Sequence, residues 1–183
     1  AAEFDRAQQM FARLRTGEMH TTPGEHDTLD ANAGEYFSRF GRASNNKGYY
    51  SFDHSGVHFV ALVNVLKYKG EHLGALGNEQ IAWLQKDLNG LSTSTPIVVF
   101  AHVPLWAVYP AWGWVTEDSQ QAMALLTRFG SVTVLNGHIH QVLQKVEGNV
   151  TFHTAMSTAF PQPAPGVGAG PGPLKIPEAQ ARP

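Results

Sequence analysis

The sequence contains no cysteine among its 183 residues. Disulfide bonds, thiolate catalysis and metal sites with sulfur ligands are therefore excluded, and any metal site must use His, Asp, Glu or Asn side chains. A chain without cysteine suits a reducing and an oxidising compartment equally well. The sequence thus leaves the localisation open, and it agrees with both a cytoplasmic and an exported (periplasmic) protein.

Long apolar runs and an excess of positive charge are missing as well. No stretch reaches the roughly 18 consecutive apolar residues that a membrane-spanning helix needs, so we expect no transmembrane segment. The formal net charge of -2 offers no basic surface to a nucleic-acid backbone. Bulk nucleic-acid binding is therefore not expected, although a phosphodiester substrate is not excluded.

The length and composition are those of one globular domain. Hydrophobic residues make up 43% of the chain and charged residues 15%, which is enough for a real core. The chain starts at Ala1 without an initiator Met or a signal-peptide pattern, from which we expect a processed, trimmed or partial chain. We predict one domain over residues 1–160 and a Pro/Gly/Ala-rich tail over residues 161–183 that is extended or disordered.

Apolar periodicity alternates between the helical and the strand repeat along this domain. We predict helices over residues 4–14, 33–40, 78–88 and 119–129. We predict strands over residues 49–53, 57–65, 97–100, 132–135, 141–146 and 150–154. Short Gly-containing turns after residues 53 and 146 predict two hairpins.

Three loops carry histidine beside glycine, proline or a carboxylate: Gly24-Glu25-His26-Asp27, Ala101-His102-Val103-Pro104 and Gly137-His138-Ile139-His140. The last two loops each follow an apolar, strand-like run. Strands that end in such loops are how α/β sandwiches gather metal ligands from distant parts of a chain, and alternate residues of an extended segment can face one site. The pattern therefore indicates a metal-dependent hydrolase.

Each loop also has a plainer interpretation. The G-H-x-H pair alone is compatible with ordinary surface histidines, and the loop at residues 24–27 alone is typical of a solvated polar turn. The stretch 103–116, rich in Trp and Tyr, fits a substrate-facing wall and a surface plug equally well. We expect Trp83 in the core. The remaining histidines are expected to be structural or solvated: His20, His54, His58, His72 and His153.

Taken in order, the three loops resemble the calcineurin-like metallophosphoesterase superfamily, and the resemblance covers roughly residues 4–160. It implies an α/β fold, an αββα sandwich of two mixed β-sheets flanked by helices. It also implies metal-dependent hydrolysis of a phosphomonoester or phosphodiester through a dinuclear metal centre and metal-bound water. The implied substrate is a small-molecule, lipid or nucleotide phosphoester, and the oligomeric state stays open.

The resemblance assigns a role to each loop residue. His102 and His138 match the histidine ligands of one metal, and His140 matches a ligand of the other. Glu25 stands where the family has an Asn ligand, and we expect it to bind metal as well. The resemblance implies His26 as the catalytic histidine and Asp27 as the acid that orients it. Imidazole and carboxylate ligands suit Mn, Fe, Zn or Ni as the divalent ions.

Two family motifs are absent from the sequence. The D-x-H and G-D loops that supply the remaining ligands do not occur before residue 24, so the fold is expected to lack its N-terminal strands, two of them from inside the sheet. We expect this chain alone to turn over substrate poorly or not at all. The alternative is a catalytically incomplete metallophosphoesterase-like fragment or binding protein. A lactamase-like hydrolase ranks last, because no H-x-H-x-D-H run is present.

Overall fold

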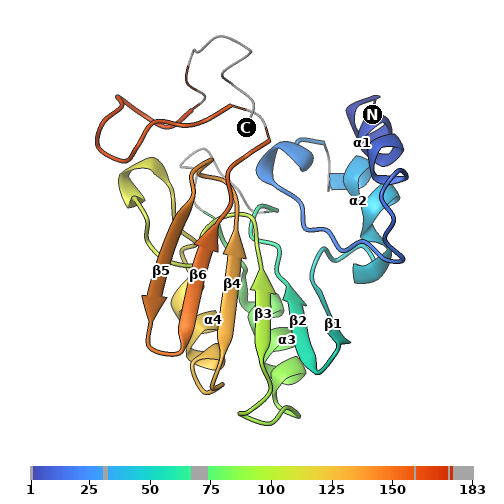
Figure 1. The fold of residues 1–183 in the computed structure, drawn as a ribbon, viewed down its shortest axis with the longest axis vertical. Helices are drawn as coiled ribbons and strands as arrows, with labels where there is room; N and C mark the ends of the chain where they lie inside the picture. Colours follow the sequence, from blue (N-terminus) through green and yellow to red (C-terminus); the bar gives the residue numbers. More distant parts are fainter. Residues whose placement is uncertain (1, 31–32, 67–73, 159, 173, 175–183) are drawn as a thin grey trace.

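The computed structural model describes residues 2–30, 33–66, 74–158, 160–172 and 174. Its centre is one six-stranded sheet with the order β1-β2-β3-β4-β6-β5 (Figure 1). The strands are β1 (Tyr50–His54), β2 (Val57–Ala61), β3 (Ile97–Phe100), β4 (Val132–Asn136), β5 (Leu143–Glu147) and β6 (Val150–Thr154). The predicted strands are therefore all present, although β2 ends earlier than expected and β5 begins later.

The sheet is mixed, with a parallel centre and antiparallel edges. Strands β2, β3, β4 and β6 run parallel, whereas β1 and β5 pair antiparallel with β2 and β6. The two predicted hairpins form these edges. Ser55 and Gly56 turn the first hairpin with φ of 51° and 79°, and Gly148 turns the second with φ of 59°. The parallel strands consequently end at one common edge of the sheet.

Two helices cover one face of the sheet, α3 (Asn78–Leu88) and α4 (Ser119–Leu126) (Figure 1). Every second residue of the central strands points to these helices, as the two-residue strand repeat requires. The buried residues of this layer include Val60, Val99, Val134, Phe152, Leu84 and Leu126. This is the main hydrophobic core of the molecule.

The opposite face of the sheet is less deeply covered by the described residues. Phe59 and Phe100 on this face are half-buried, and Leu135 is 42% exposed. The α/β class, the mixed sheet and the flanking helices are confirmed. The described residues form one sheet and not the second sheet of the expected sandwich. The six strands of the described residues are paired in unbroken order, and the absence of N-terminal strands stays a prediction.

A second, smaller cluster lies beyond β1 (Figure 1). It contains α1 (Ala2–Phe11) and α2 (Gly34–Phe40), which pack through Phe4, Tyr36, Phe37 and Phe40. Arg39 of α2 joins the two helices by an ion pair with Asp5, 2.9 Å long. The chain between them carries η1 (Glu25–Asp27) to the sheet, and η3 (Gly41–Ser44) follows α2.

The described part of the predicted tail folds back above the ends of β4 and β6 (Figure 1). The N–H of Leu174 donates to the carbonyl of Pro161, 2.9 Å away, which brings distant ends of this segment together. A domain boundary at residue 160 stays a prediction. Among the described residues, no helix has the length and apolar character that crossing a membrane requires.

Candidate metal centre

The parallel register of β3 and β4 brings two of the histidine loops together. Phe100 pairs with Leu135, so both strands end at the same level, and the loops continue side by side. The N–H of Gly137 donates to the carbonyl of His102, 3.0 Å away, and joins the two loops. The rings of His102 and His138 consequently lie 5.3 Å apart between centroids.

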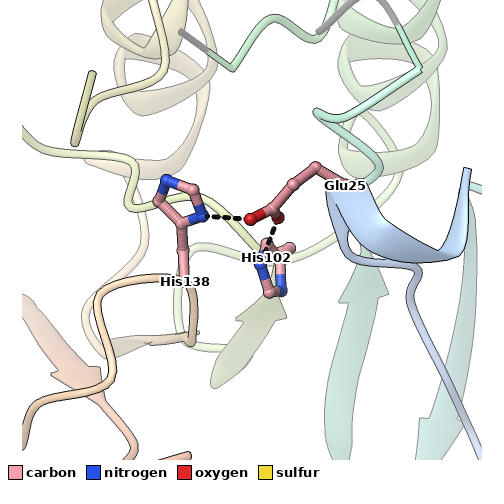
Figure 2. A group of neighbouring side chains, drawn as sticks. All are labelled: Glu25, His102 and His138. Carbon is pink, nitrogen blue, oxygen red and sulfur yellow. Dashed lines mark hydrogen bonds and ion pairs between the residues drawn. The ribbon is translucent and has the colours of Figure 1, made fainter. Parts of the chain in front are cut away.

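The third loop places Glu25 between these two rings (Figure 2). One carboxylate oxygen, Oε2, lies 2.7 Å from Nε2 of His102, and the other, Oε1, lies 3.1 Å from Nδ1 of His138. The side chains of Glu25 and His138 are largely buried, with 16% and 6% exposed. Three of the residues predicted as metal ligands, from separate loops, thus meet at one point.

The electrostatics of this group favour a permanently charged carboxylate. Burial alone would raise the pKa of Glu25, but its contacts with the imidazoles of His102 and His138 outweigh burial and hold that pKa well below its usual range. Glu25 is therefore ionised at every pH near neutrality. A fixed negative charge with imidazoles on both sides is a suitable environment for a cation.

The residues fit a divalent ion. One ligand atom from each of Glu25, His102 and His138 lies within 4.8 Å of the others. Glu25 Oε2 is buried and accepts no hydrogen bond of acceptable geometry, so it retains a lone pair. Two imidazoles and one carboxylate form a set of ligands typical of catalytic sites that keep an open position. Within the described ranges, no other group of three or more such side chains converges in this way.

Gly24 makes the close approach of the first loop possible. A Cβ at this position would lie 2.9 Å from a ring carbon of His102, which real Cβ atoms do not tolerate. Asp27 closes the same turn, because its Oδ2 accepts a hydrogen bond of 2.9 Å from the N–H of Gly24. The Asp27 carboxylate is therefore hydrogen-bonded to the backbone of its own loop. The expected role of Asp27 in orienting His26 stays a prediction.

His26 lies at the rim of the centre. Its side chain is 88% exposed, and its Nε2 lies 3.7 Å from Oε1 of Glu25. It lines a pocket beside the three ligands. An exposed imidazole in this position is accessible to a bound phosphoester, and the predicted catalytic role agrees with this location without being tested by it.

The G-H-x-H loop has an unusual backbone. His138 and His140 both have positive φ, 67° and 52°, in the left-handed region that costs a non-glycine residue about 1–2 kcal/mol. Ile139 between them is fully buried and anchors the loop. Such conformations cluster at functional sites, where the surrounding structure enforces them.

His140 lies beside the ligand group and is not one of its three members. Its Nδ1 donates a hydrogen bond to the carbonyl of Phe160. This bond places the proton on Nδ1 and leaves the lone pair on Nε2 in the neutral ring. The prediction of His140 as a ligand of a second metal remains a prediction.

Two buried asparagines position the His102 loop, and the sequence analysis missed both. Asn64 accepts a hydrogen bond of 3.2 Å from the N–H of Val103 and donates one of 2.8 Å to its carbonyl. Asn136, the last residue of β4, donates one of 2.9 Å to the carbonyl of Ala101. Their signal in the sequence is a single asparagine within or at the end of an apolar run.

The tryptophans of the loop after β3 have different environments. Trp114 is 1% exposed and packs edge-on against Trp112, with ring centroids 5.1 Å apart. Trp112 is half-buried and lines the pocket at the metal centre. Trp106 packs against Phe152, 5.0 Å away, on the helix-covered side. The loop therefore combines a buried plug with a wall of the pocket.

The other histidines have varied surroundings. His58 is buried between two carboxylates, and His20 stacks on Phe52 with ring centroids 3.6 Å apart. His54 is exposed and His153 half-buried on the sheet. His72 lies outside the described residues. Trp83 packs against the main core from α3, in agreement with its predicted position.

Comparison with known proteins gives a consistent result. The sequence model of the family described as calcineurin-like phosphoesterase matches residues 3–142. Purple acid phosphatase 15 of Arabidopsis thaliana is 36% identical over 124 residues, which cover 63% of this chain and 21% of that protein. Purple acid phosphatase 23 of the same plant is 36% identical over 100 residues, covering 53% and 20%.

A solved structure shares the fold. The crystal structure of a dimetal phosphatase from Danio rerio superimposes with a TM-score of 0.62 at 15% sequence identity, covering 75% of this chain and 60% of the other. The chain thus spans about a fifth of the length of the plant relatives that it matches, at 21% and 20%.

Proposed function

Since the chain belongs to the calcineurin-like phosphoesterase family, we propose that it contributes to the metal-dependent hydrolysis of a phosphoester. The observation that carries this proposal is the convergence of Glu25, His102 and His138 at the edge where the parallel strands end. Two imidazoles and one carboxylate from loops far apart in the sequence form a ligand set that suits a divalent ion with an open position.

The residues of the centre have distinct tasks in this proposal. A divalent ion bound there supplies Lewis-acid stabilisation of phosphoryl charge and activation of water. Glu25 offers a fixed charge and His102 and His138 neutral nitrogen ligands. His26, exposed at the rim, donates a hydrogen bond or a proton to the phosphoryl group or the leaving oxygen. Asp27 holds the turn that carries His26.

A second candidate function has its own support. The described residues provide one three-residue ligand group, which suits one metal ion and not the two of a dinuclear centre. His140 is nearby but bonded to Phe160 through Nδ1. A chain with this ligand set alone would bind a metal and a phosphoester without rapid turnover, as a catalytically incomplete relative.

Elemental analysis of the chain after incubation with Mn²⁺ and dialysis tests the centre. We expect about one ion per chain, and an affinity at least about tenfold lower for Glu25→Gln, because even residues that merely support ligands change metal affinity by that factor. Glu117→Gln, at an exposed acid, is the matched control and should bind normally. Unchanged binding by Glu25→Gln would contradict the assignment of the site.

Hydrolysis of an aryl phosphate and a diaryl phosphate decides between the two functions. Mn²⁺-dependent cleavage that His138→Ala abolishes supports the phosphoesterase, and metal binding without cleavage supports the incomplete relative. Two tightly bound ions per chain, or rapid turnover, would contradict the interpretation of the described ligands as half of a centre. If the chain showed no metal binding and no cleavage, the proposed function would be refuted.

A further inference from the structure

The segment of residues 160–172, which we call the C-terminal loop, is fastened to the metal centre. The carbonyl of Phe160 accepts a hydrogen bond from His140, and Nε2 of Gln162 donates one of 3.2 Å to the carbonyl of His138. Nε2 of Gln141 donates another of 3.2 Å to the carbonyl of Gln162. These bonds join the loop to both histidines of the G-H-x-H motif and to the residue after them.

The C-terminal loop also has a compact internal structure. The N–H of Gly172 lies 3.4 Å from Oε1 of Gln162, and the N–H of Val167 donates to the carbonyl of Ala164 at 3.1 Å. A Cβ at Gly168 would lie 2.8 Å from Pro163 and 3.6 Å from the ring of Trp112. Compact surface loops of this kind, packed by their own residues, are frequently functional.

A pocket of about 390 Å³ lies between this loop and the metal centre. Its lining combines the side chains of Glu25, His138 and His140 with those of Trp112, Gln162 and Pro171. The volume is in the range that small organic ligands occupy. The pocket is therefore amphipathic, because ionisable side chains, an aromatic ring and a proline line the same space.

We propose that Trp112 and the C-terminal loop form a subsite for the organic group of the phosphoester, and that this subsite favours an aromatic group. The inference rests on the proposed function, since it assigns the phosphoryl end of the ligand to the histidine side of the pocket. The indole of Trp112 and the ring of Pro171 offer apolar surface on which a planar group stacks or packs edge-on. A small polar alcohol gains nothing from this wall.

Gln162 positions the subsite. Its Nε2 donates a hydrogen bond to the carbonyl of His138, and its Oε1 accepts one from the N–H of Gly172. Gln162 therefore links the G-H-x-H loop to Gly172 at the other end of the C-terminal loop, next to Pro171. Without this link, the part of the pocket lining next to Pro171 loses its attachment to the metal centre.

Calorimetric titration of the Mn²⁺-loaded 183-residue chain with two phosphonates, which are not hydrolysed, tests the subsite without turnover. Methylphosphonate reports binding of the phosphoryl end, and phenylphosphonate adds an aromatic ring. We expect phenylphosphonate to bind about tenfold more tightly, the effect of burying part of one ring. Trp112→Ala and Gln162→Ala should each reduce this preference to less than about threefold.

Two further variants make the test specific. Trp112→Phe retains an aromatic ring and should retain most of the preference, which guards against a fold defect in Trp112→Ala. Gln144→Ala, on the exposed edge strand β5, is the matched control for Gln162→Ala and should keep the full preference.

Equal affinity of the wild-type chain for both phosphonates overturns the subsite and leaves the proposed function intact. A preference that survives both Trp112→Ala and Gln162→Ala also overturns it. If neither phosphonate binds, both the proposed function and the subsite are refuted.

Discussion

At the scale of single residues, the metal centre depends on how closely the first loop can approach His102. Gly24 and Glu25 are neighbours with complementary tasks, since Gly24 provides the space and Glu25 occupies it with a carboxylate 2.7 Å from the His102 ring. The conformation of Gly24 itself is extended, with φ of -92° and ψ of 172°. Its requirement for glycine is therefore steric and does not arise from backbone strain.

Gly24→Ala should weaken the centre for that reason. The added methyl group meets the His102 ring, so either the loop or the ring must move, at a cost of about 1–3 kcal/mol in the free energy of unfolding. Mn²⁺ affinity should fall about tenfold, because Glu25 moves with the loop. Urea unfolding and metal titration measure the two effects. Gly17→Ala is the control, since a Cβ there would meet nothing within 4 Å.

The sequence predicted the members of the centre better than their supports. Glu25, His102 and His138 stand out because histidine and glutamate occur beside Gly or after an apolar strand. Asn64 and Asn136 also belong to apolar runs, but nothing in the sequence shows which groups they bind, because their hydrogen bonds to the 101–103 backbone join segments adjacent only in the fold. The bond between His140 and Phe160 was equally invisible, because nothing in the tail shows where it returns.

At the scale of elements, a buried histidine fastens the β1–β2 hairpin to α3. His58 of β2 lies between Asp53 of β1 and Asp87 of α3, with each ring nitrogen 2.9 Å from a carboxylate oxygen. Ser51 donates a further hydrogen bond of 2.6 Å to Asp87. The hydrogen bond to Asp87 is the main cause that raises the pKa of His58 above 6.5, against the effect of burial and with help from Asp53.

The stabilising effect of His58 should therefore depend on pH. A pKa raised in the folded state means that the contribution is complete below the unfolded value of 6.5 and is lost as pH rises through the higher folded value. The difference in Tm between wild type and His58→Gln should be largest at about pH 5.5–6.5 and decrease toward alkaline pH, because the imidazole loses its proton there. Thermal unfolding followed by circular dichroism measures it. A difference that grows with pH would contradict the stabilising role of His58 between Asp53 and Asp87. His54→Gln, at the exposed last residue of β1, is the control.

Helices and strands were predictable to the extent that their apolar repeat was regular. The strands after residues 96 and 131 and the helix α3 (Asn78–Leu88) follow the pattern closely. The strand expected over residues 57–65 ends at Ala61, although the N–H of Leu62 still donates to the carbonyl of Phe100, 2.9 Å away. Beyond it, the backbone of Val63 binds the side chain of Gln80 on α3 instead of a neighbouring strand. The C-terminal loop has a Pro/Gly composition without any repeat, so its path could not be read from the sequence.

At the scale of the whole molecule, the two faces of the sheet differ in burial. Leu126 of α4 is completely buried in the core on the helix side, whereas Leu135 on the opposite face is 42% exposed. Phe52 and Phe59 stack on that second face with ring centroids 4.9 Å apart. Apolar burial on the helix side therefore provides most of the stability of this chain.

The same truncation on the two faces should have unequal effects. Leu126→Ala removes buried methyl groups and leaves a cavity, so it should lower the free energy of unfolding by about 2–5 kcal/mol. Leu135→Ala, at the partly exposed site, should lower it by less than about 1 kcal/mol. Urea unfolding of the two variants under identical conditions gives the comparison. Equal losses would show that the second face is covered in solution.

The parallel register of β2, β3 and β4 also separates the parts of the chain that can change from those that cannot. The turns that lead into β3 and β4 lie at the end of the sheet opposite the metal centre (Figure 1), and a Cβ at Gly90 would meet nothing within 4 Å. Extra residues inserted there, such as a fluorophore-binding tag, would lengthen the chain between the ligands without moving them. The paired strands β3 and β4 fix the positions of His102 and His138, and Glu25 comes from η1 before the insertion points, so a labelled version of this protein can be built from the end opposite its chemistry.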